Sequence, residues 1–156
     1  MKEAIFGAGC FWEVEYKFSK LDGVEETNVG YAAGVSENPN YQTVCSGTTG
    51  HAEVVKVNYD ESKISYLDLL KFFFQIHDPT QVNRQGPDVG SQYRSLIITS
   101  NSEQEKEALN YIEELNSSKI HSSKVATIVQ GKSEYYPAEE YHQKYLEKKG
   151  VTSCKI

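Results

Sequence analysis

Residues 4–13, AIFGAGCFWE, indicate how the chain begins to fold. The apolar run at their start predicts a short strand over residues 3–8, and the glycines that follow let the backbone turn tightly. A helix is predicted from Cys10 to about Lys20. Cys10 is therefore expected at a helix N-terminus, where unpaired N–H groups and the helix dipole stabilise a thiolate.

Two aromatic residues follow Cys10 directly. Phe11 and Trp12 supply an apolar wall beside the sulfur. An activated thiol next to aromatic rings indicates nucleophilic or redox chemistry on a small apolar group. A cysteine is also often a small buried hydrophobic residue, so the local pattern alone leaves both roles open.

The size and charge of the chain narrow its class. Its 156 residues predict a single domain, residues 1–156, that can bury a core without disulfides. The 16 Lys and Arg residues against 22 Asp and Glu residues give a net charge of −6, which argues against nucleic acid or an anionic membrane surface as partner. No apolar run is long enough to cross a bilayer, and no signal peptide is evident, so we expect a cytoplasmic protein.

The cysteines and histidines point to thiol chemistry without a metal. The three cysteines are Cys10, Cys45 and Cys154, an odd number at wide spacing. This pattern is not a disulfide framework and contains no CxxC pair, which favours a reducing compartment. No two of the four histidines have the spacing of metal ligands, so we expect no metal site.

Outward from residues 4–13, strands and helices are predicted in mixed order. Further strands are expected at residues 24–33, 51–59, 94–99 and 125–130. Capping boxes open two helices, and Pro137 opens a third. These helices are expected after Ser65, after Ser102, and from Pro137 to about Lys149. Residues 150–156 are expected to form a flexible tail, and the whole pattern predicts an α+β or α/β two-layer sandwich.

Glu53 is a candidate proton donor. On the alternating strand it shares a face with Val55 and Val57, which favours burial of that face. Burial disfavours the ionised carboxyl, so its pKa is expected to rise and leave a proton to donate near neutral pH. The alternative is a surface glutamate at the end of an edge strand. His51 lies on the same face, which allows a hydrogen bond to Glu53.

Three further polar candidates lie in loops. Residues 86–95 form a long polar loop that contains Asp88 and Tyr93, and long loops in compact domains are often functional. A turn aspartate and an aromatic residue at the start of a strand are the ordinary alternatives. Tyr41 follows a turn-like Asn-Pro-Asn and has a packing alternative, whereas His142 is expected on the surface.

Five blocks of sequence resemble those of the A-type methionine sulfoxide reductases, and together they cover nearly the whole chain in order. They are GCFW (residues 9–12), NYQTVCSG (40–47), TGHAEV (49–54), the run from HDPT through NRQG to QYRS (77–95), and PAEEYHQ (137–143). The resemblance implies a ferredoxin-like α+β sandwich with a mixed, mostly antiparallel sheet and flanking helices. It also implies reduction of the S epimer of methionine sulfoxide, free and in proteins.

Carried over by position, the resemblance assigns roles to the residues around Cys10. Cys10 is the implied nucleophile, which becomes a sulfenic acid as methionine leaves, and Phe11 and Trp12 form the implied pocket for the substrate methyl group. Asp88 is implied to support the cysteine through water or backbone contacts. Three side chains are implied to bind the sulfoxide oxygen: Tyr41, Glu53 and Tyr93. Of these, Glu53 is the implied proton donor.

The resemblance also implies how the thiol is regenerated. A second thiol condenses with the sulfenic acid to give a disulfide, which thioredoxin usually reduces in this family. Cys154 is the first choice because a mobile tail can reach the site, and Cys45 is the alternative. A chain without an efficient resolving cysteine depends on glutaredoxin, glutathione or another external thiol. No cofactor is implied. Glu13 departs from the family pattern and is expected to raise the Cys10 pKa unless it points to solvent.

Two other classes of function are weighed against this one. A cysteine hydrolase or acyl transferase requires a histidine base next to Cys10, and His51 is the candidate. A redox sensor or binding module requires only an oxidisable thiol and predicts no turnover of a sulfoxide.

Overall fold

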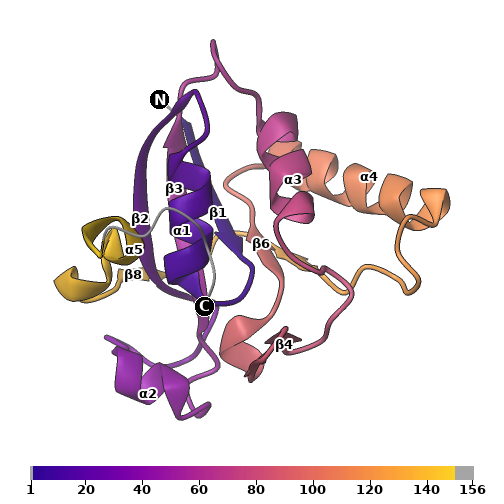
Figure 1. The fold of residues 1–156 in the computed structure, drawn as a ribbon. Helices are drawn as coiled ribbons and strands as arrows, with labels where there is room; N and C mark the ends of the chain where they lie inside the picture. Colours follow the sequence, from indigo (N-terminus) through magenta and orange to yellow (C-terminus); the bar gives the residue numbers. More distant parts are fainter. Residues whose placement is uncertain (1, 150–156) are drawn as a thin grey trace.

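The computed structural model describes residues 2–149, and within them one mixed sheet carries the fold (Figure 1). Its strands lie in the order β7-β6-β1-β3-β2-β8, and every neighbouring pair is antiparallel except β6 and β7. The prediction of an α+β fold with a mixed, mostly antiparallel sheet is confirmed. The strands are β1 (Lys2–Gly7), β2 (Val24–Ala32), β3 (Ala52–Tyr59), β6 (Leu96–Ile98), β7 (Ile128–Gln130) and β8 (Tyr135–Pro137).

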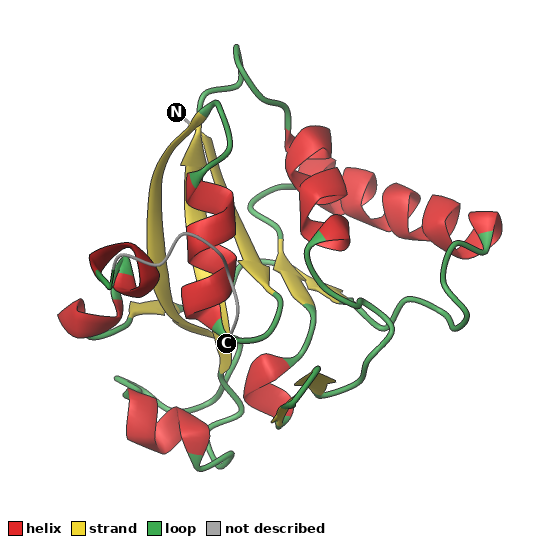
Figure 2. Cartoon of the chain, in the orientation of Figure 1, coloured by secondary structure: helices red, strands yellow, loops and turns green. Residues whose placement is uncertain are grey.

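The helices differ in length and in place. Figure 2 shows α1 lying over one face of the sheet, with α3 and α4 on the side of β6. The helices are α1 (Phe11–Ser19), α2 (Tyr41–Cys45), α3 (Tyr66–Gln75), α4 (Ser102–Ser118) and α5 (Tyr145–Lys148). Short elements are the hairpin of β4 (Arg84–Gln85) with β5 (Asp88–Val89) and the 3₁₀ turns η1 (Ser91–Tyr93) and η2 (Glu140–His142).

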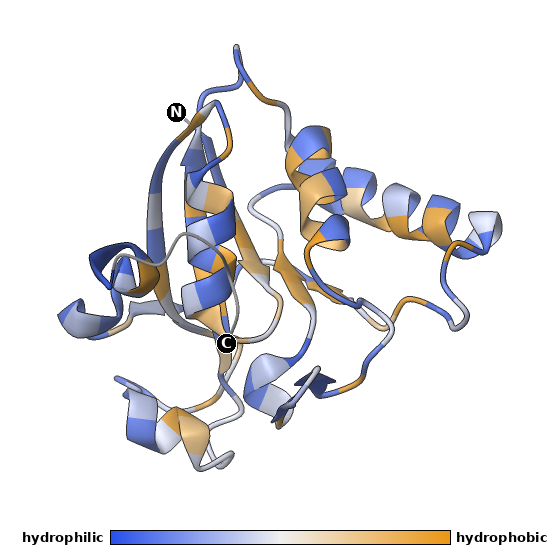
Figure 3. Cartoon of the chain, viewed as in Figure 1, coloured by the Kyte–Doolittle hydropathy of each residue, from blue (hydrophilic) through white to orange (hydrophobic). Residues whose placement is uncertain are grey.

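The main core lies between the sheet and its helices. Alternation along β3 buries Glu53, Val55, Val57 and Tyr59 on one face, as the sequence predicted. The opposite face contributes a smaller cluster that includes Val54. In Figure 3 hydrophobic colours follow β6 and the side of α3 that faces the sheet. This packing holds β1 beside β3. Because the two strands are antiparallel, the end of β1 and the start of α1 lie close to the start of β3.

Local side chains start α3 and α4. Ser65 Oγ accepts the Asp68 N–H at 3.1 Å, and Asp68 Oδ2 accepts the Ser65 N–H at 3.2 Å, which confirms the predicted capping box. The predicted cap at Ser102 is wrong by one residue. Asn101 is the N-cap, and its Oδ1 accepts the Gln104 N–H at 2.9 Å, because asparagine is at least as good a cap as serine.

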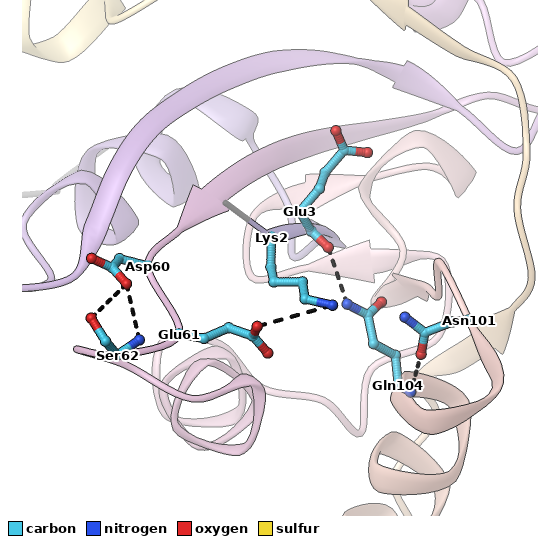
Figure 4. Close-up of polar contacts among 7 residues, drawn as sticks. All are labelled: Lys2, Glu3, Asp60, Glu61, Ser62, Asn101 and Gln104. Carbon is cyan, nitrogen blue, oxygen red and sulfur yellow. Dashed lines mark hydrogen bonds and ion pairs between the residues drawn. The ribbon is translucent and has the colours of Figure 1, made fainter.

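The start of α4 is also tied to the first strand. Gln104 Nε2 donates to the backbone oxygen of Glu3 at 3.0 Å (Figure 4). In the same view Lys2 Nζ lies 4.0 Å from Glu61 Oε1, an exposed ion pair that contributes little to stability. The hydrogen bond between Gln104 and Glu3 therefore fixes where α4 begins relative to β1.

The C-terminal part of the described chain differs from the prediction. Instead of opening a helix that runs to about Lys149, Pro137 ends β8, where it pairs with Gly30 of β2. The turn η2 and the four-residue α5 follow. Proline suits an edge strand because it has no N–H to donate. The predicted tail, residues 150–156, lies outside the described residues.

Candidate functional site

Cys10 immediately precedes α1, as predicted. The turn before it needs Gly9, whose φ is +94° and where an added Cβ would lie 3.0 Å from Gln85. The Cys10 side chain makes no cap hydrogen bond, although the N–H groups of Trp12 and Glu13 lie close enough to favour a thiolate. Burial and the charge of Glu53 outweigh them and raise the pKa of Cys10 to about 12. The predicted stabilisation by N–H groups is therefore present, but burial outweighs it and favours the thiol form in the free protein.

Glu53 lies beneath the start of α1. Its side chain is 2% exposed, and Oε1 accepts the Phe11 N–H at 3.1 Å. Oε2 is buried and has no hydrogen-bond partner among the described residues. Burial raises the pKa of Glu53 to about 8, opposed by the Phe11 N–H and assisted by the charge of Asp88. The predicted burial of this carboxyl is confirmed, and burial shifts its pKa in the predicted direction.

Tyr41 and Tyr93 converge on the same place from different segments. Tyr41 is the first residue of α2, and Tyr93 is the last residue of η1. Figure 1 shows both elements gathered around the N-terminal end of α1. Burial raises the pKa of each phenol, and the nearby charge of Glu53 raises both further, so both hydroxyls remain donors. Each hydroxyl also interacts with the half-buried thiol of Cys45.

Asp88 and Cys10 line the same hollow of about 190 Å³, together with Gln85. The Asp88 charge adds to the rise in the pKa of Cys10 and of Glu53. Glu13 lies on the rim of the same hollow, and its carboxylate is 3.6 Å from Lys17 Nζ. Burial and the charge of Glu53, rather than the Glu13 carboxylate, are the main causes of the raised pKa of Cys10.

The two residues that follow Cys10 belong to a cluster of aromatic rings. The Trp12 indole Nε1–H donates to His142 Nδ1 at 2.9 Å, and the ring of Tyr145 stacks on the indole at 3.9 Å. The His142 ring lies 5.3 Å from the ring of Phe11 and 4.7 Å from that of Tyr41. The prediction of a surface histidine is wrong, because His142 is 1% exposed.

Glu139 connects α2 to the sheet. One carboxylate oxygen accepts the Tyr31 hydroxyl at 2.9 Å, and the other accepts the Tyr41 N–H at 3.1 Å. Neither the role of Glu139 nor the burial of His142 was predicted from the sequence. Their one signal was membership of the PAEEYHQ block, which resembles the family without revealing what its side chains contact.

A second carboxylate with the same kind of contact is Glu15. It is 2% exposed, its Oε1 accepts the Lys144 N–H at 2.7 Å, and its Oε2 accepts the Thr27 hydroxyl at 2.9 Å. The bond to Lys144 holds the segment that leads into α5. Because Tyr145 follows directly, Glu15 also fixes the ring that stacks on Trp12.

His51 does not form the expected hydrogen bond to Glu53. Its Nδ1 accepts the Gly34 N–H at 3.0 Å, so its Nε2 carries the proton and donates to the Ser36 oxygen at 2.7 Å. Both nitrogens are used to hold the loop before α2. The hydrolase alternative therefore lacks its histidine base.

Across residues 2–149, no cluster of three or more His, Cys, Asp or Glu side chains is arranged to hold a metal ion. Within the same residues no helix is both long and apolar enough to cross a membrane. Cys154, the first choice as resolving thiol, lies outside the described residues. The structure does place Cys45, the alternative, beside Tyr41 and Tyr93.

Comparison with known proteins identifies the family of the chain. The family model described as peptide methionine sulfoxide reductase matches residues 2–156. A Nautilia profundicola protein named peptide methionine sulfoxide reductase MsrA is 53% identical over 148 residues, which are 95% of this chain and 84% of that protein. The structure of Mxr1 from Saccharomyces cerevisiae in reduced form has a TM-score of 0.90 and 38% identity, and the match covers 98% of this chain and 88% of that one.

A second yeast structure shows the same kind of protein with a partner. It is described as Mxr1 in complex with Trx2, with a TM-score of 0.65 and 27% identity over 92% of this chain and 84% of that one. The family match spans the segments that carry Cys10, Glu53 and both tyrosines. The chain belongs to the peptide methionine sulfoxide reductases of the A type, enzymes that reduce methionine sulfoxide.

Proposed function

We propose that residues 1–156 form a single catalytic domain that reduces the S epimer of methionine sulfoxide, free and in proteins, at Cys10. The observation that carries this proposal is the buried carboxyl of Glu53. It holds a proton near neutral pH, and its Oε2 has no partner among the described residues. A buried polar atom without a partner is costly, so the free oxygen supports binding of a substrate group there.

The sulfoxide oxygen fits the three donors. Its partial negative charge attracts the protonated carboxyl of Glu53 and the hydroxyls of Tyr41 and Tyr93, which remain protonated because their pKa values are raised. Donors fixed before the reaction stabilise charge that develops on oxygen in the transition state. The methyl group lies against Phe11 and Trp12, which orients the sulfur toward Cys10.

The reaction transfers one oxygen atom. The positive end of the polarised S–O bond favours ionisation of the nearby Cys10 thiol, whose pKa is high in the free site. The Cys10 sulfur attacks the substrate sulfur, Glu53 protonates the oxygen, and a bond forms between the two sulfurs. The hydroxyl then moves to the Cys10 sulfur as the substrate S–O bond breaks. The sulfur–sulfur bond breaks with its electron pair left on methionine, which leaves, and Cys10 is a sulfenic acid. The thiol is oxidised, the sulfoxide is reduced, and the proton lost by the thiol balances the one gained by oxygen.

Asp88 takes a supporting role. Its charge adds to the effect of burial in raising the pKa of Glu53, which keeps the proton donor protonated before substrate binds. The shared hollow with Cys10 supports contact through water or the backbone. No metal or organic cofactor takes part in this cycle.

A second thiol then removes the oxygen from Cys10 as water and leaves a disulfide. We propose Cys154 for this step, with Cys45 as the alternative because it lies beside the two tyrosines. The yeast relative in complex with Trx2 supports thioredoxin as the reductant. Glutaredoxin or glutathione replaces it if neither cysteine resolves the sulfenic acid.

The fold and setting follow from the same proposal. The order β6-β1-β3-β2, with antiparallel neighbours and α1 and α3 in the crossings, supports a ferredoxin-like sandwich. Three widely spaced cysteines without a disulfide framework support a reducing, cytoplasmic setting.

The test is a single turnover without added reductant. Reduced protein is mixed with racemic methionine sulfoxide, and methionine and protein mass are measured. We expect about one methionine per chain from the S epimer only. Loss of two hydrogen atoms from the protein supports an internal resolving cysteine, whereas gain of one oxygen atom supports an external thiol. No methionine from either epimer overturns the proposal and favours a redox sensor.

A further inference from the structure

We infer that Glu139 is a positioning residue that holds α2, and with it the Tyr41 hydroxyl, in register with Glu53. This inference rests on the proposed role of Tyr41 in binding the sulfoxide oxygen. Glu139 itself acts through Tyr41 and through its contact with the sheet. The inference follows from the two partners of its hydrogen bonds, Tyr31 and Tyr41.

The first bond leads to the strand position opposite Glu53. Glu139 Oε1 accepts the hydroxyl of Tyr31, a fully buried residue of β2. Tyr31 is paired with Glu53 of β3 in the antiparallel register. Because neighbouring strand positions are fixed by the sheet, the Tyr31 hydroxyl is a rigid point of reference for the Glu53 carboxyl.

The second bond leads to the start of α2. Glu139 Oε2 accepts the N–H of Tyr41 at 3.1 Å, and this N–H belongs to the first residue of the helix. First-turn N–H groups have no partner within a helix, so an outside acceptor fixes the end of the helix directly. A bond to an ionised acceptor is stronger than one between neutral groups.

The segment that contains α2 needs such an anchor. It is a long connection between β2 and β3 in which α2 contributes five residues. The cap of α2 is Asn40, whose bonds to Thr43 stay within the segment and do not orient it toward the site. Burial raises the pKa of Glu139, but the Tyr41 N–H and the Tyr31 hydroxyl, among others, bring it below its usual value, so the carboxylate is ionised.

The first experiment compares two methionine substitutions. Glu139→Met keeps the length of the side chain and removes both acceptors. Glu140→Met makes the same change one residue later, at an exposed position. We expect Glu139→Met to slow single-turnover methionine formation about tenfold through misplacement of Tyr41, and Glu140→Met to leave the rate unchanged.

Glu139→Gln is the conservative rescue. Its amide oxygen can accept the Tyr41 N–H, and its amide N–H can donate to the Tyr31 hydroxyl oxygen. We expect this variant to recover most of the rate. A rate as low as that of Glu139→Met would overturn the hydrogen-bonding role.

A double-mutant cycle with Tyr41→Phe separates the inference from the proposed function. If Glu139 acts through the Tyr41 hydroxyl, Glu139→Met slows the Tyr41→Phe protein little or not at all. Additive losses, or a Glu139→Met rate equal to wild type while Tyr41→Phe is slow, overturn the inference alone. An unchanged rate for Tyr41→Phe itself overturns the proposed role of Tyr41.

A measurement on the unchanged protein covers the case in which Glu139→Met does not fold. Amide hydrogen exchange of Tyr41 reports the bond to Glu139 directly. We expect slow exchange at this first-turn amide. Exchange as fast as in an unstructured peptide would overturn the inference.

Discussion

The helices around Cys10 and the helices away from it begin in different ways. Away from the site, α3 and α4 are capped by Ser65 and Asn101, which directly precede them. Around the site, α1 has no side-chain cap from Cys10, and a distant carboxylate binds its first N–H instead. Distant carboxylates also bind α2, which has a local cap as well, and the residue before α5. The three carboxylates belong to Glu53, Glu139 and Glu15.

The difference shows what each kind of cap can do. A local cap satisfies N–H groups and defines where a helix starts, but it carries no information about tertiary position. The carboxylates at the site reach over 42, 98 and 129 residues of sequence. They therefore fix the starts of α1, α2 and the α5 segment relative to one another, which is what a preorganised site requires.

The strongest way to break this contrast is Cys10→Ser. Serine is a favoured N-cap residue, so the change gives α1 the local cap that it lacks. We expect single-turnover methionine formation to fall at least about a thousandfold, since the proposed nucleophile is lost. We also expect the free energy of unfolding in urea to rise by about 0.5–1 kcal/mol. Substantial remaining turnover would mean that Cys10 is not the nucleophile.

Glu53→Gln removes the proton while keeping an oxygen that can accept the Phe11 N–H. We expect the single-turnover rate to fall about a hundredfold, in the range for loss of one transition-state donor. The wild-type rate should decline as the pH rises through about 8, because the protonated form of Glu53 is then lost. The variant should show no such decline. A shared pH profile would exclude Glu53 as the donor.

The same substitution changes how stability depends on pH. Folding raises the pKa of Glu53 from 4.5 to about 8, so the folded protein binds the proton more tightly than the unfolded chain. Its contribution to stability is present below pH 4.5 and is lost progressively up to about pH 8. The free energy of unfolding in urea should therefore rise for Glu53→Gln relative to wild type as the pH increases across this range. The rise should be at most about 1.4 kcal/mol per pH unit. A constant difference would contradict a carboxyl that stays protonated when folded.

His142 tests a long-range contact that carries no charge. Trp12 is the one tryptophan of the chain, so its fluorescence reports the indole that His142 holds. His142→Phe keeps a ring and removes the acceptor, and His142→Asn keeps an acceptor close to the backbone without the ring. For His142→Phe we expect a shifted emission spectrum and an about fivefold higher half-saturating sulfoxide concentration in single turnovers, which corresponds to loss of one hydrogen bond.

His142→Asn should change both properties less. If His142→Phe leaves the emission and the half-saturating concentration as in wild type, the hydrogen bond does not hold the indole in place.

Asn101→Ala should have the smallest effect on the reaction. Loss of this local cap is expected to lower the free energy of unfolding by about 1 kcal/mol. The single-turnover rate at a temperature well below the unfolding transition should stay unchanged, since α4 contributes no residue to the site. A slower reaction in this variant would show that local caps also tune the site and would remove the contrast.

The sequence allowed prediction of what depends on neighbours in the chain. Cys10 was placed at a helix start by the apolar run and glycines before it, and burial of Glu53 followed from alternation along β3. The positions of Tyr41, Tyr93 and Asp88 near Cys10 could be expected only through the family resemblance.

What depends on distant contacts could not be predicted. The raised pKa of Cys10 arises from burial and from Glu53, neither of which is local. His142 was predicted on the surface because its partner, the Trp12 indole, lies 130 residues away in the sequence. The prediction of a helix after Pro137 was wrong because the segment pairs with the edge of β2 instead. The sequence of one segment does not show that such an edge is available.

The contact between Trp12 and His142 also has a consequence for synthesis of the protein. A ribosome releases Cys10 and the residues of α1 early, whereas β8 and η2 emerge near the end. Until then β2 lacks its last pairing partner, and Phe11 and Trp12 lack the His142 ring that packs against them. The nascent chain therefore carries the Cys10 thiol before the His142 ring can pack against the two aromatic residues that follow Cys10.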